Sequence, residues 1–182
     1  MGRPQLSLPE VGRCVGRGVV MLMTQALKGT GPADIPRAVE SFRGHYGRHL
    51  TERTRLYPGV RETVLGFSRK RQAICSNKPE DFVRAILARL DFAAPFEEVV
   101  GGDTFQTQKP DPEGLNTILD RMGVAPGEAV MVGDSPIDIA TGRAAGVRTL
   151  AVCYGNSPRE RLLAAGPDAL LESFSELTKH VD

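Results

Sequence analysis

A short apolar run followed by two carboxylates places the strongest constraint on this chain. Residues 129–132 read Ala-Val-Met-Val, a length typical of a buried parallel strand, and the run ends at Gly133. Asp134 and Asp138 follow, one helical turn apart. Because ligands of open α/β sheets bind beyond the carboxyl ends of the strands, this pattern predicts a site for a hard cation such as Mg²⁺.

A simpler interpretation exists for the first of these aspartates. An Asp shortly before an early Pro is a common start of a helix, so Asp134 could cap a helix that Pro136 opens. Capping explains only one aspartate, whereas Asp138 lies one turn further on and faces the same direction. We therefore favour the cation site and keep capping as the alternative.

Two more polar motifs precede this segment, and the three together carry a resemblance. The sequence of Gly133 to Asp138 follows Ser76-Asn77-Lys78-Pro79 and Lys109-Pro110-Asp111-Pro112. In this order the motifs resemble the haloacid dehalogenase-like hydrolase superfamily, and most of all its phosphoglycolate phosphatase branch. The resemblance implies an α/β fold, a parallel sheet with helices on both faces and a small helical cap. It also implies Mg²⁺-dependent hydrolysis of a small phosphorylated metabolite, 2-phosphoglycolate, through an aspartyl-phosphate.

The resemblance gives the first two motifs a role in holding phosphate. Ser76 would bind the phosphate through its hydroxyl, with the amide of Asn77 as a second donor, and Lys109 would bridge the nucleophile and the phosphate. We therefore predict Ser76 and Lys109 as catalytic residues. The alternatives are a helix cap for Ser76, ahead of Pro79, and plain loop surface for Lys109.

The last motif would hold the metal. Asp134 would ligate Mg²⁺ directly, and Asp138 would support the metal or pair with Lys109. In the cap, Arg17 is the residue best suited to grip a substrate carboxylate, because its planar guanidinium matches one. Asp103 resembles a position near a strand tip, where a supporting role and a turn role are both open.

One part of the family pattern is missing. Members carry the nucleophile in an N-terminal strand reading Asp-x-Asp-Gly-Thr, and these 182 residues contain no such sequence. The resemblance places that strand centrally, between the strands ending at Ser76 and Asp134. Without it, those two strands either pair directly or expose unpaired edges.

Two explanations of this absence remain. Either the chain is truncated, and about ten to twenty upstream residues would restore the strand and its flanks, or it is a non-catalytic binding or regulatory relative. Loss of the whole strand, and not of its aspartates alone, favours truncation. We predict that the 182-residue chain is inactive as a phosphatase. A phosphosugar mutase would share the core motifs and is the alternative among enzymes.

The order of the expected elements predicts two domains. Residues 1–56 show only helical patterns, with starts at Ser7 and Asp34, and form the expected cap. Residues 57–182 alternate strands and helices, which predicts right-handed crossovers in an incomplete α/β core. The expected strands are 72–75, 98–100, 129–132, 148–152 and 169–171. The expected core helices are 79–90, 112–122, one from 136, 158–165 and 173–180.

Composition excludes several other classes. A net charge of +1 gives no reason to expect nucleic acid or an anionic membrane as a partner. No apolar run is long enough to span a bilayer, and we expect a cytoplasmic protein. Three scattered cysteines argue against a disulfide framework and a zinc site. His45 and His49 have a metal-compatible spacing without a third ligand nearby, so we expect them to face solvent.

Overall fold

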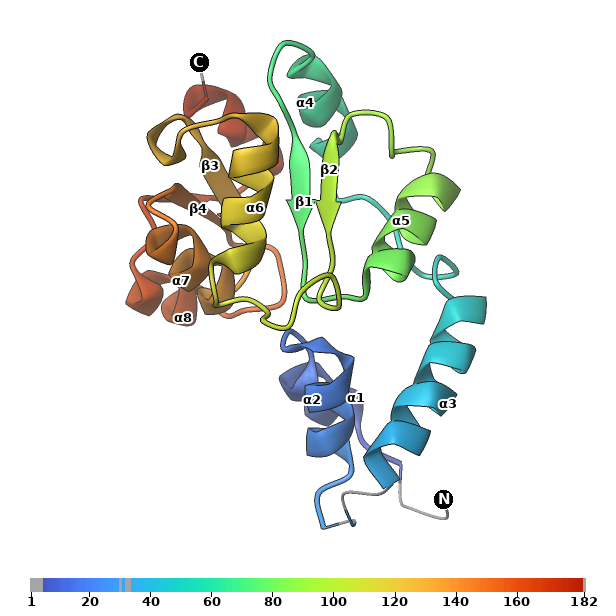
Figure 1. The fold of residues 1–182 in the computed structure, drawn as a ribbon. Helices are drawn as coiled ribbons and strands as arrows, with labels where there is room; N and C mark the ends of the chain where they lie inside the picture. Colours follow the sequence, from blue (N-terminus) through green and yellow to red (C-terminus); the bar gives the residue numbers. More distant parts are fainter. Residues whose placement is uncertain (1–4, 30, 32–33, 182) are drawn as a thin grey trace.

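The computed structural model describes residues 5–29, 31 and 34–181 and has a helical part beside an α/β part (Figure 1). The helical part contains α1 (Leu8–Cys14), α2 (Gly18–Ala26) and α3 (Asp34–Arg48). The strands are β1 (Ala73–Cys75), β2 (Glu98–Val100), β3 (Val130–Gly133), β4 (Arg148–Val152) and β5 (Ala169–Leu171). The remaining helices are α4 (Val60–Gly66), α5 (Glu80–Arg89), α6 (Glu113–Met122), α7 (Pro136–Ala144) and α8 (Arg159–Ala165), with 3₁₀ helices η1 (Pro126–Glu128) and η2 (Phe174–Lys179).

The helix expected to start at Ser7 is split into two short helices, α1 and α2. The carboxylate of Glu10 accepts the amide of Ser7 at 2.8 Å, as the capping-box spacing predicts for the start of α1. The helical path then breaks between α1 and α2, where Gly16 and Gly18 have φ angles of 115° and 80°. Since glycine adopts such angles at little steric cost, these residues set the break and the direction of α2.

Aromatic packing attaches α3 to the core. The rings of Phe42 and Tyr46 stack at 5.2 Å, and Tyr46 meets the ring of Phe82, on α5, at 5.4 Å. Lys78 donates to the Tyr46 hydroxyl at 2.7 Å. The helical part is therefore held against the loop that follows β1.

The strands form two parallel sheets within the described residues. One has the order β1-β2 and the other β3-β4-β5, so β1 and β3 do not pair with each other. The α/β fold with parallel strands is confirmed. Of the two outcomes expected without a central strand, the structure has the unpaired edges and not the direct pairing.

Side chains hold the two sheets together from both faces. On one face, α6 contributes Leu115 and Leu119 to a cluster that contains Met131 of β3 and contacts Cys75 of β1. On the other face, Phe174 of η2 packs against clusters belonging to both sheets. In Figure 1, α6 lies in front of the region between β1 and β3. Apolar packing thus fixes the relative position of the strand ends without a backbone ladder between them.

Two short elements differ from expectation. The core, expected from residue 57, opens with a helix that was not expected, α4, whose start follows Gly59 in a left-handed conformation with φ of 77°. The last expected helix, 173–180, is the 3₁₀ helix η2. Both elements are six or seven residues long, too short for a clear apolar periodicity in the sequence.

The packing of α8 against the β3-β4-β5 sheet gives a matched test of the fold. Leu162 is fully buried, whereas its neighbour Leu163 is 55% exposed. Leu162→Ala should lower the free energy of unfolding by about 2–5 kcal/mol, because it removes buried methyl groups and leaves a cavity. Leu163→Ala should change it by no more than about 0.5 kcal/mol. Urea denaturation of both variants measures the difference, and equal losses would show that α8 is packed otherwise.

Candidate active site

A lysine joins the carboxyl ends of the two sheets. Lys109 Nζ donates to the carbonyl oxygen of Cys75, at the end of β1, at 2.7 Å. It also donates to Oδ1 of Asp138, in the first turn of α7 after β3, at 2.6 Å. The side chains of Lys109 and Asp138 are 13% and 10% exposed. Breaking such a pair by removing one partner costs about 3–5 kcal/mol, because the other charge stays buried.

Burial also sets the state of the thiol beside this lysine. It raises the pKa of Cys75, and the nearby ammonium of Lys109 opposes that rise only in part. Cys75 is therefore a neutral thiol at pH 7.

Asn77 holds the loop that carries Lys109. Its Oδ1 accepts the Lys109 amide at 2.9 Å, and its Nδ2 donates to the Lys109 carbonyl at 2.9 Å. The same Nδ2 donates to the carbonyl of Gly16 at 3.0 Å, in the break between α1 and α2. The buried Asn77 side chain thus ties β1, the lysine loop and the helical part together.

Ser76 ends β1 with its backbone paired to the neighbouring strand. Its amide donates to the carbonyl of Val100 at 2.9 Å, and its Oγ accepts the amide of Lys78 at 3.1 Å. The N-cap position of α5 is Pro79, so the alternative in which Ser76 caps this helix is wrong. The Ser76 hydroxyl lies at the strand tip with its proton available to donate.

Asp138 is engaged on both oxygens. Its Oδ2 accepts the amides of Asp134 and Ser135 at 3.2 and 3.1 Å and the Ser135 hydroxyl at 2.7 Å. Its Oδ1 accepts Lys109. A cation would have to compete with these bonds, so the geometry favours the second of the roles expected for Asp138, pairing with the lysine and support of the site.

Asp134 does not cap α7. The N-cap is Ser135, whose Oγ accepts the amide of Asp138 at 3.4 Å. The carboxylate of Asp134 instead accepts two bonds on Oδ2 from Asn156, in the turn after β4. Oδ1 of Asp134 has no hydrogen-bond partner among the described residues. The capping interpretation is therefore wrong, and one carboxylate oxygen is left for a ligand.

The donor set fits Mg²⁺ in a particular way. No three His, Cys, Asp or Glu side chains gather into a metal cage in the part of the chain that the structure describes. Mg²⁺ is commonly held by one or two carboxylates, with water and substrate phosphate completing its shell. The free Oδ1 of Asp134, a residue whose backbone amide bonds to Asp138, suits that mode of binding. It does not suit a cation that needs a complete protein cage.

The remaining predicted residues lie around this centre. Arg17 is exposed at the N-cap of α2, next to Gly16, whose carbonyl Asn77 binds. Asp103 accepts the amide of Glu80 through Oδ1 at 2.8 Å, and its Oδ2 lies 3.6 Å from Arg43, so it supports the start of α5. His45 and His49 are both exposed, as expected, and their ring centroids lie 4.6 Å apart.

The turn after β4 contributes site residues that sequence reasoning missed. Tyr154, Gly155 and Asn156 follow the strand that pairs with β3, so they reach the same edge of the sheet. Burial first, then the neighbouring Tyr57 and Asp134, raise the pKa of Tyr154 to about 12. This hydroxyl stays neutral at physiological pH. The available signal was a Gly-Asn pair three residues after a buried strand, at the sheet edge where ligands bind.

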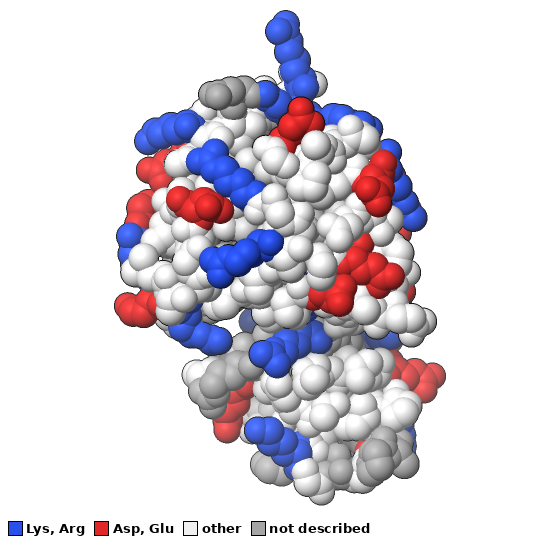
Figure 2. Space-filling view, turned by 60° about the vertical axis from the view of Figure 1, so that its left-hand side comes forward, with Lys and Arg blue, Asp and Glu red and all other residues white. Residues whose placement is uncertain are grey.

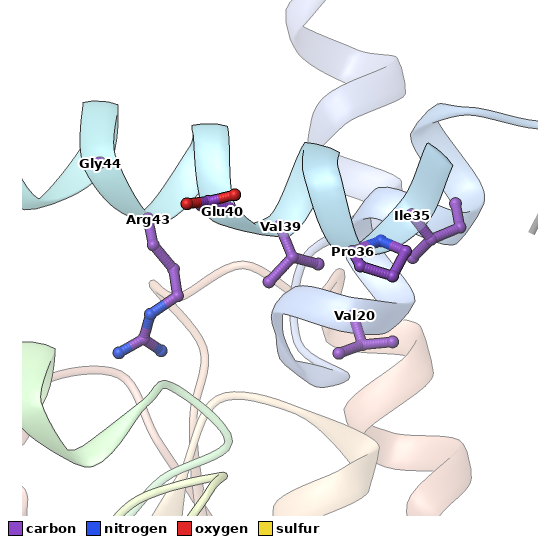
Figure 3. Close-up of a pocket in the computed structure, with 7 residues that line it drawn as sticks. All are labelled: Val20, Ile35, Pro36, Val39, Glu40, Arg43 and Gly44. Carbon is purple, nitrogen blue, oxygen red and sulfur yellow. The ribbon is translucent and has the colours of Figure 1, made fainter. Parts of the chain in front are cut away.

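The surface and the helical part complete the picture. On the face shown in Figure 2, positive and negative side chains are interspersed and form no extended area of one sign. A cavity of about 640 Å³ lies between α2 and α3, where Val20 faces Ile35, Pro36 and Val39 (Figure 3). It contains none of the predicted site residues. No helix of the described residues is long and apolar enough to cross a membrane.

Comparison with known proteins identifies the family. Residues 2–152 match the haloacid dehalogenase-like hydrolase family. The chain belongs to this family. It is 38% identical to a phosphoglycolate phosphatase of Rhodospirillum rubrum, over 92% of this chain and 73% of that protein. It is 32% identical to phosphoglycolate phosphatase 1 of Pseudomonas aeruginosa, over 100% of this chain and 69% of the relative.

A solved structure agrees with this assignment. The crystal structure of a predicted phosphoglycolate phosphatase from Haemophilus somnus superposes with a TM-score of 0.91 at 26% identity, covering 98% of this chain and 84% of that one. The sequence resemblance to phosphoglycolate phosphatases is confirmed over nearly the whole chain. Haloacid dehalogenase-like hydrolases typically depend on Mg²⁺, which agrees with the oxygen donors at the strand ends.

The two aspartates nearest the strand tips give a test of the cation site. Asp134→Asn removes the charge from the oxygen that we expect to ligate the cation, so it should weaken Mg²⁺ binding by about tenfold or more. Asp103→Asn, at the start of α5, should leave Mg²⁺ affinity unchanged. Isothermal titration calorimetry of the two variants makes the comparison, and equal affinities would remove Asp134 from the site.

Proposed function

We propose that this haloacid dehalogenase-like hydrolase binds a small phosphomonoester and Mg²⁺ at the carboxyl ends of β1 and β3. The observation that carries the proposal is the position of Lys109, whose ammonium contacts the end of β1 and Asp138 of α7 at once. Phosphoryl transfer asks a protein mainly for positioning and for neutralisation of charge. A buried ammonium between two strand tips supplies both.

Each group has a distinct task at this site. The Ser76 hydroxyl and the backbone amide of Asn77 donate to phosphate oxygens, and Lys109 neutralises the charge of these oxygens. Asp134 holds the cation, which when bound lowers the negative charge on the phosphoryl group. Asp138 keeps the lysine in place through the 2.6 Å bond between the two side chains.

The substrate we propose is 2-phosphoglycolate, on two grounds. The relatives from Rhodospirillum rubrum and Pseudomonas aeruginosa are phosphoglycolate phosphatases. In addition, Asn77 ties the loop at Gly16 to the site, and the next residue, Arg17, offers a guanidinium suited to a second anionic group on the substrate. A carboxylate is such a group.

A nucleophile is absent from this sequence, so we propose that the 182-residue chain binds the phosphomonoester without hydrolysing it. No Asp-x-Asp-Gly-Thr segment occurs in it. The edges of β1 and β3 support the proposal that such a segment would lie between them. The peptide that joins Cys75 and Ser76 sends its amide to β2, and its carbonyl therefore points the other way, towards Lys109.

The edge of β3 has the matching orientation. The carbonyl of Thr149 accepts a bond from Asp168, on the β5 side of β4. Successive residues of a parallel strand direct their N–H and C=O groups to alternate sides, so Leu150 faces β3. Val132 lies opposite Leu150, and the N–H and C=O groups of Val130 and Val132 therefore point away from β4. They have no backbone partner on that side among the described residues. Both residues are half-buried, and an unpartnered peptide group costs about 1–3 kcal/mol when fully buried, so one added parallel strand would stabilise this edge.

A comparison of two chains tests both halves of this proposal. The 182-residue chain should release phosphate from 2-phosphoglycolate no faster than a water control. A chain extended at its N-terminus by an apolar strand reading into Asp-x-Asp-Gly-Thr should melt several degrees higher and should release phosphate with Mg²⁺. Thermal melts and a phosphate-release assay measure the two effects.

A control separates stability from chemistry. The same added segment with asparagine in place of both aspartates should restore the melting temperature but not hydrolysis. An extended chain no more stable than the 182-residue chain would mean that the strand belongs elsewhere. Hydrolysis by the 182-residue chain that Asp134→Ala abolishes would refute the proposed inactivity.

A non-catalytic binding or regulatory role is the second candidate. The specific observation in its favour is that Ser76, Lys109 and Asp134 are assembled in a chain whose sequence contains no Asp-x-Asp pair. It predicts that the extended chain gains stability without gaining hydrolysis. The phosphosugar mutase alternative would be recognised in the same extended chain by isomerisation of a hexose phosphate.

A further inference from the structure

The turn after β4 holds Asp134 through a single residue. The backbone amide of Asn156 donates to Oδ2 of Asp134 at 2.8 Å, and its side-chain Nδ2 donates to the same oxygen at 3.1 Å. A carboxylate at neutral pH only accepts hydrogen bonds, so the amide must present its nitrogen here and not its oxygen. Both bonds converge on one oxygen and leave Oδ1 without a hydrogen-bond partner among the described residues.

Close packing makes this arrangement specific. A Cβ atom at Gly155 would lie 2.2 Å from Cβ of Asp134, so only glycine lets the turn approach this side chain. The preceding Tyr154 packs its ring 4.8 Å from that of Tyr57 and against the core cluster around Leu150. The turn is therefore anchored on one side by aromatic packing and lies directly against Asp134 on the other.

We propose that Asn156 is a positioning residue that engages Oδ2 of Asp134 and presents Oδ1 alone to the cation. This inference rests on the proposed Mg²⁺ site. Mg²⁺ demands near-ideal octahedral geometry, in which each carboxylate gives one oxygen, whereas Ca²⁺ accepts carboxylates through one oxygen or both. A carboxylate with one oxygen already bound by two N–H groups offers a cation only its other oxygen. Asn156 thereby favours Mg²⁺ over Ca²⁺.

Titration of the full chain with Mg²⁺ and with Ca²⁺ tests the inference. Asn156→Ala removes the side-chain donor, so Mg²⁺ affinity should fall by about tenfold, the lower end of the effect of such supporting bonds. Ca²⁺ affinity should fall less, because Oδ2 then keeps only the backbone amide of Asn156 and is more readily recruited as a second ligand oxygen. The ratio of Mg²⁺ to Ca²⁺ affinity should therefore drop. Asn116→Ala, on the exposed surface of α6, is the control and should leave both affinities unchanged.

The cation selectivity separates positioning from a merely structural role. A general loosening of the turn would weaken both cations alike, and melting temperatures without cations detect it directly. Asn156→Asp keeps the size of the side chain and removes the donor. Its added charge attracts both cations, so the ratio of Mg²⁺ to Ca²⁺ affinity reports the lost donor and should again fall. An Asn156→Ala chain that binds Mg²⁺ as the unmodified chain does, or that loses both cations equally, overturns the inference.

Asp134→Asn distinguishes this inference from the function on which it rests. If Asp134→Asn weakens Mg²⁺ binding while Asn156→Ala does not, the cation site stands and the role of Asn156 is wrong. If Asp134→Asn binds Mg²⁺ as the unmodified chain does, or the unmodified chain binds none, the proposed site and the role of Asn156 both fail.

Discussion

The buried ion pair between Lys109 and Asp138 is the interaction on which the site depends. No backbone ladder joins β1 to β3 in the described chain, so their carboxyl ends are held in register by side chains. Lys109 contacts the end of β1 and α7 together. A buried ammonium requires a partner, and Asp138 provides it while also capping α7 through Ser135. The first turn of that helix, the lysine loop and the strand end are consequently fixed as one unit.

The division of labour between the two aspartates follows from this pair. Asp138 is buried and has both oxygens bound within the protein. Asp134 is held from the other direction, by Asn156 on Oδ2, and keeps one oxygen for a ligand. Two carboxylates four residues apart thus take different tasks because their hydrogen-bond partners differ. The pattern Asp-x-x-x-Asp alone does not reveal which of them would meet the cation.

Much of the fold was predictable because its signals are local. Short runs rich in apolar residues gave strands β2, β4 and β5 at their exact limits. The contact of Lys109 with Asp138 was one of the two roles expected for that aspartate, and the rule that parallel strands end at one edge explains why it also meets the end of β1. Helix α4 and the 3₁₀ form of η2 were not, because they are set by packing over six or seven residues.

The contacts of Asn156 show where sequence reasoning stops. They depend on the parallel register of β3 and β4, which places the turn after β4 next to Asp134 although 22 residues separate them. The separation of the strands into two sheets is likewise a tertiary property, since it depends on how α6 and η2 hold β1 and β3 from either side. A pattern in a single strand contains no information on its neighbour.

The central claim is that phosphate and Mg²⁺ bind together at this edge, and it is tested most directly by their thermodynamic coupling. Inorganic phosphate is titrated into the full chain with and without Mg²⁺, and the titration is repeated with Asp134→Asn. Since a cation and an anion in contact raise each other's affinity, phosphate should bind about tenfold more tightly with Mg²⁺, and Asp134→Asn should remove the difference. The same phosphate affinity with and without Mg²⁺ in the unmodified chain would contradict the account.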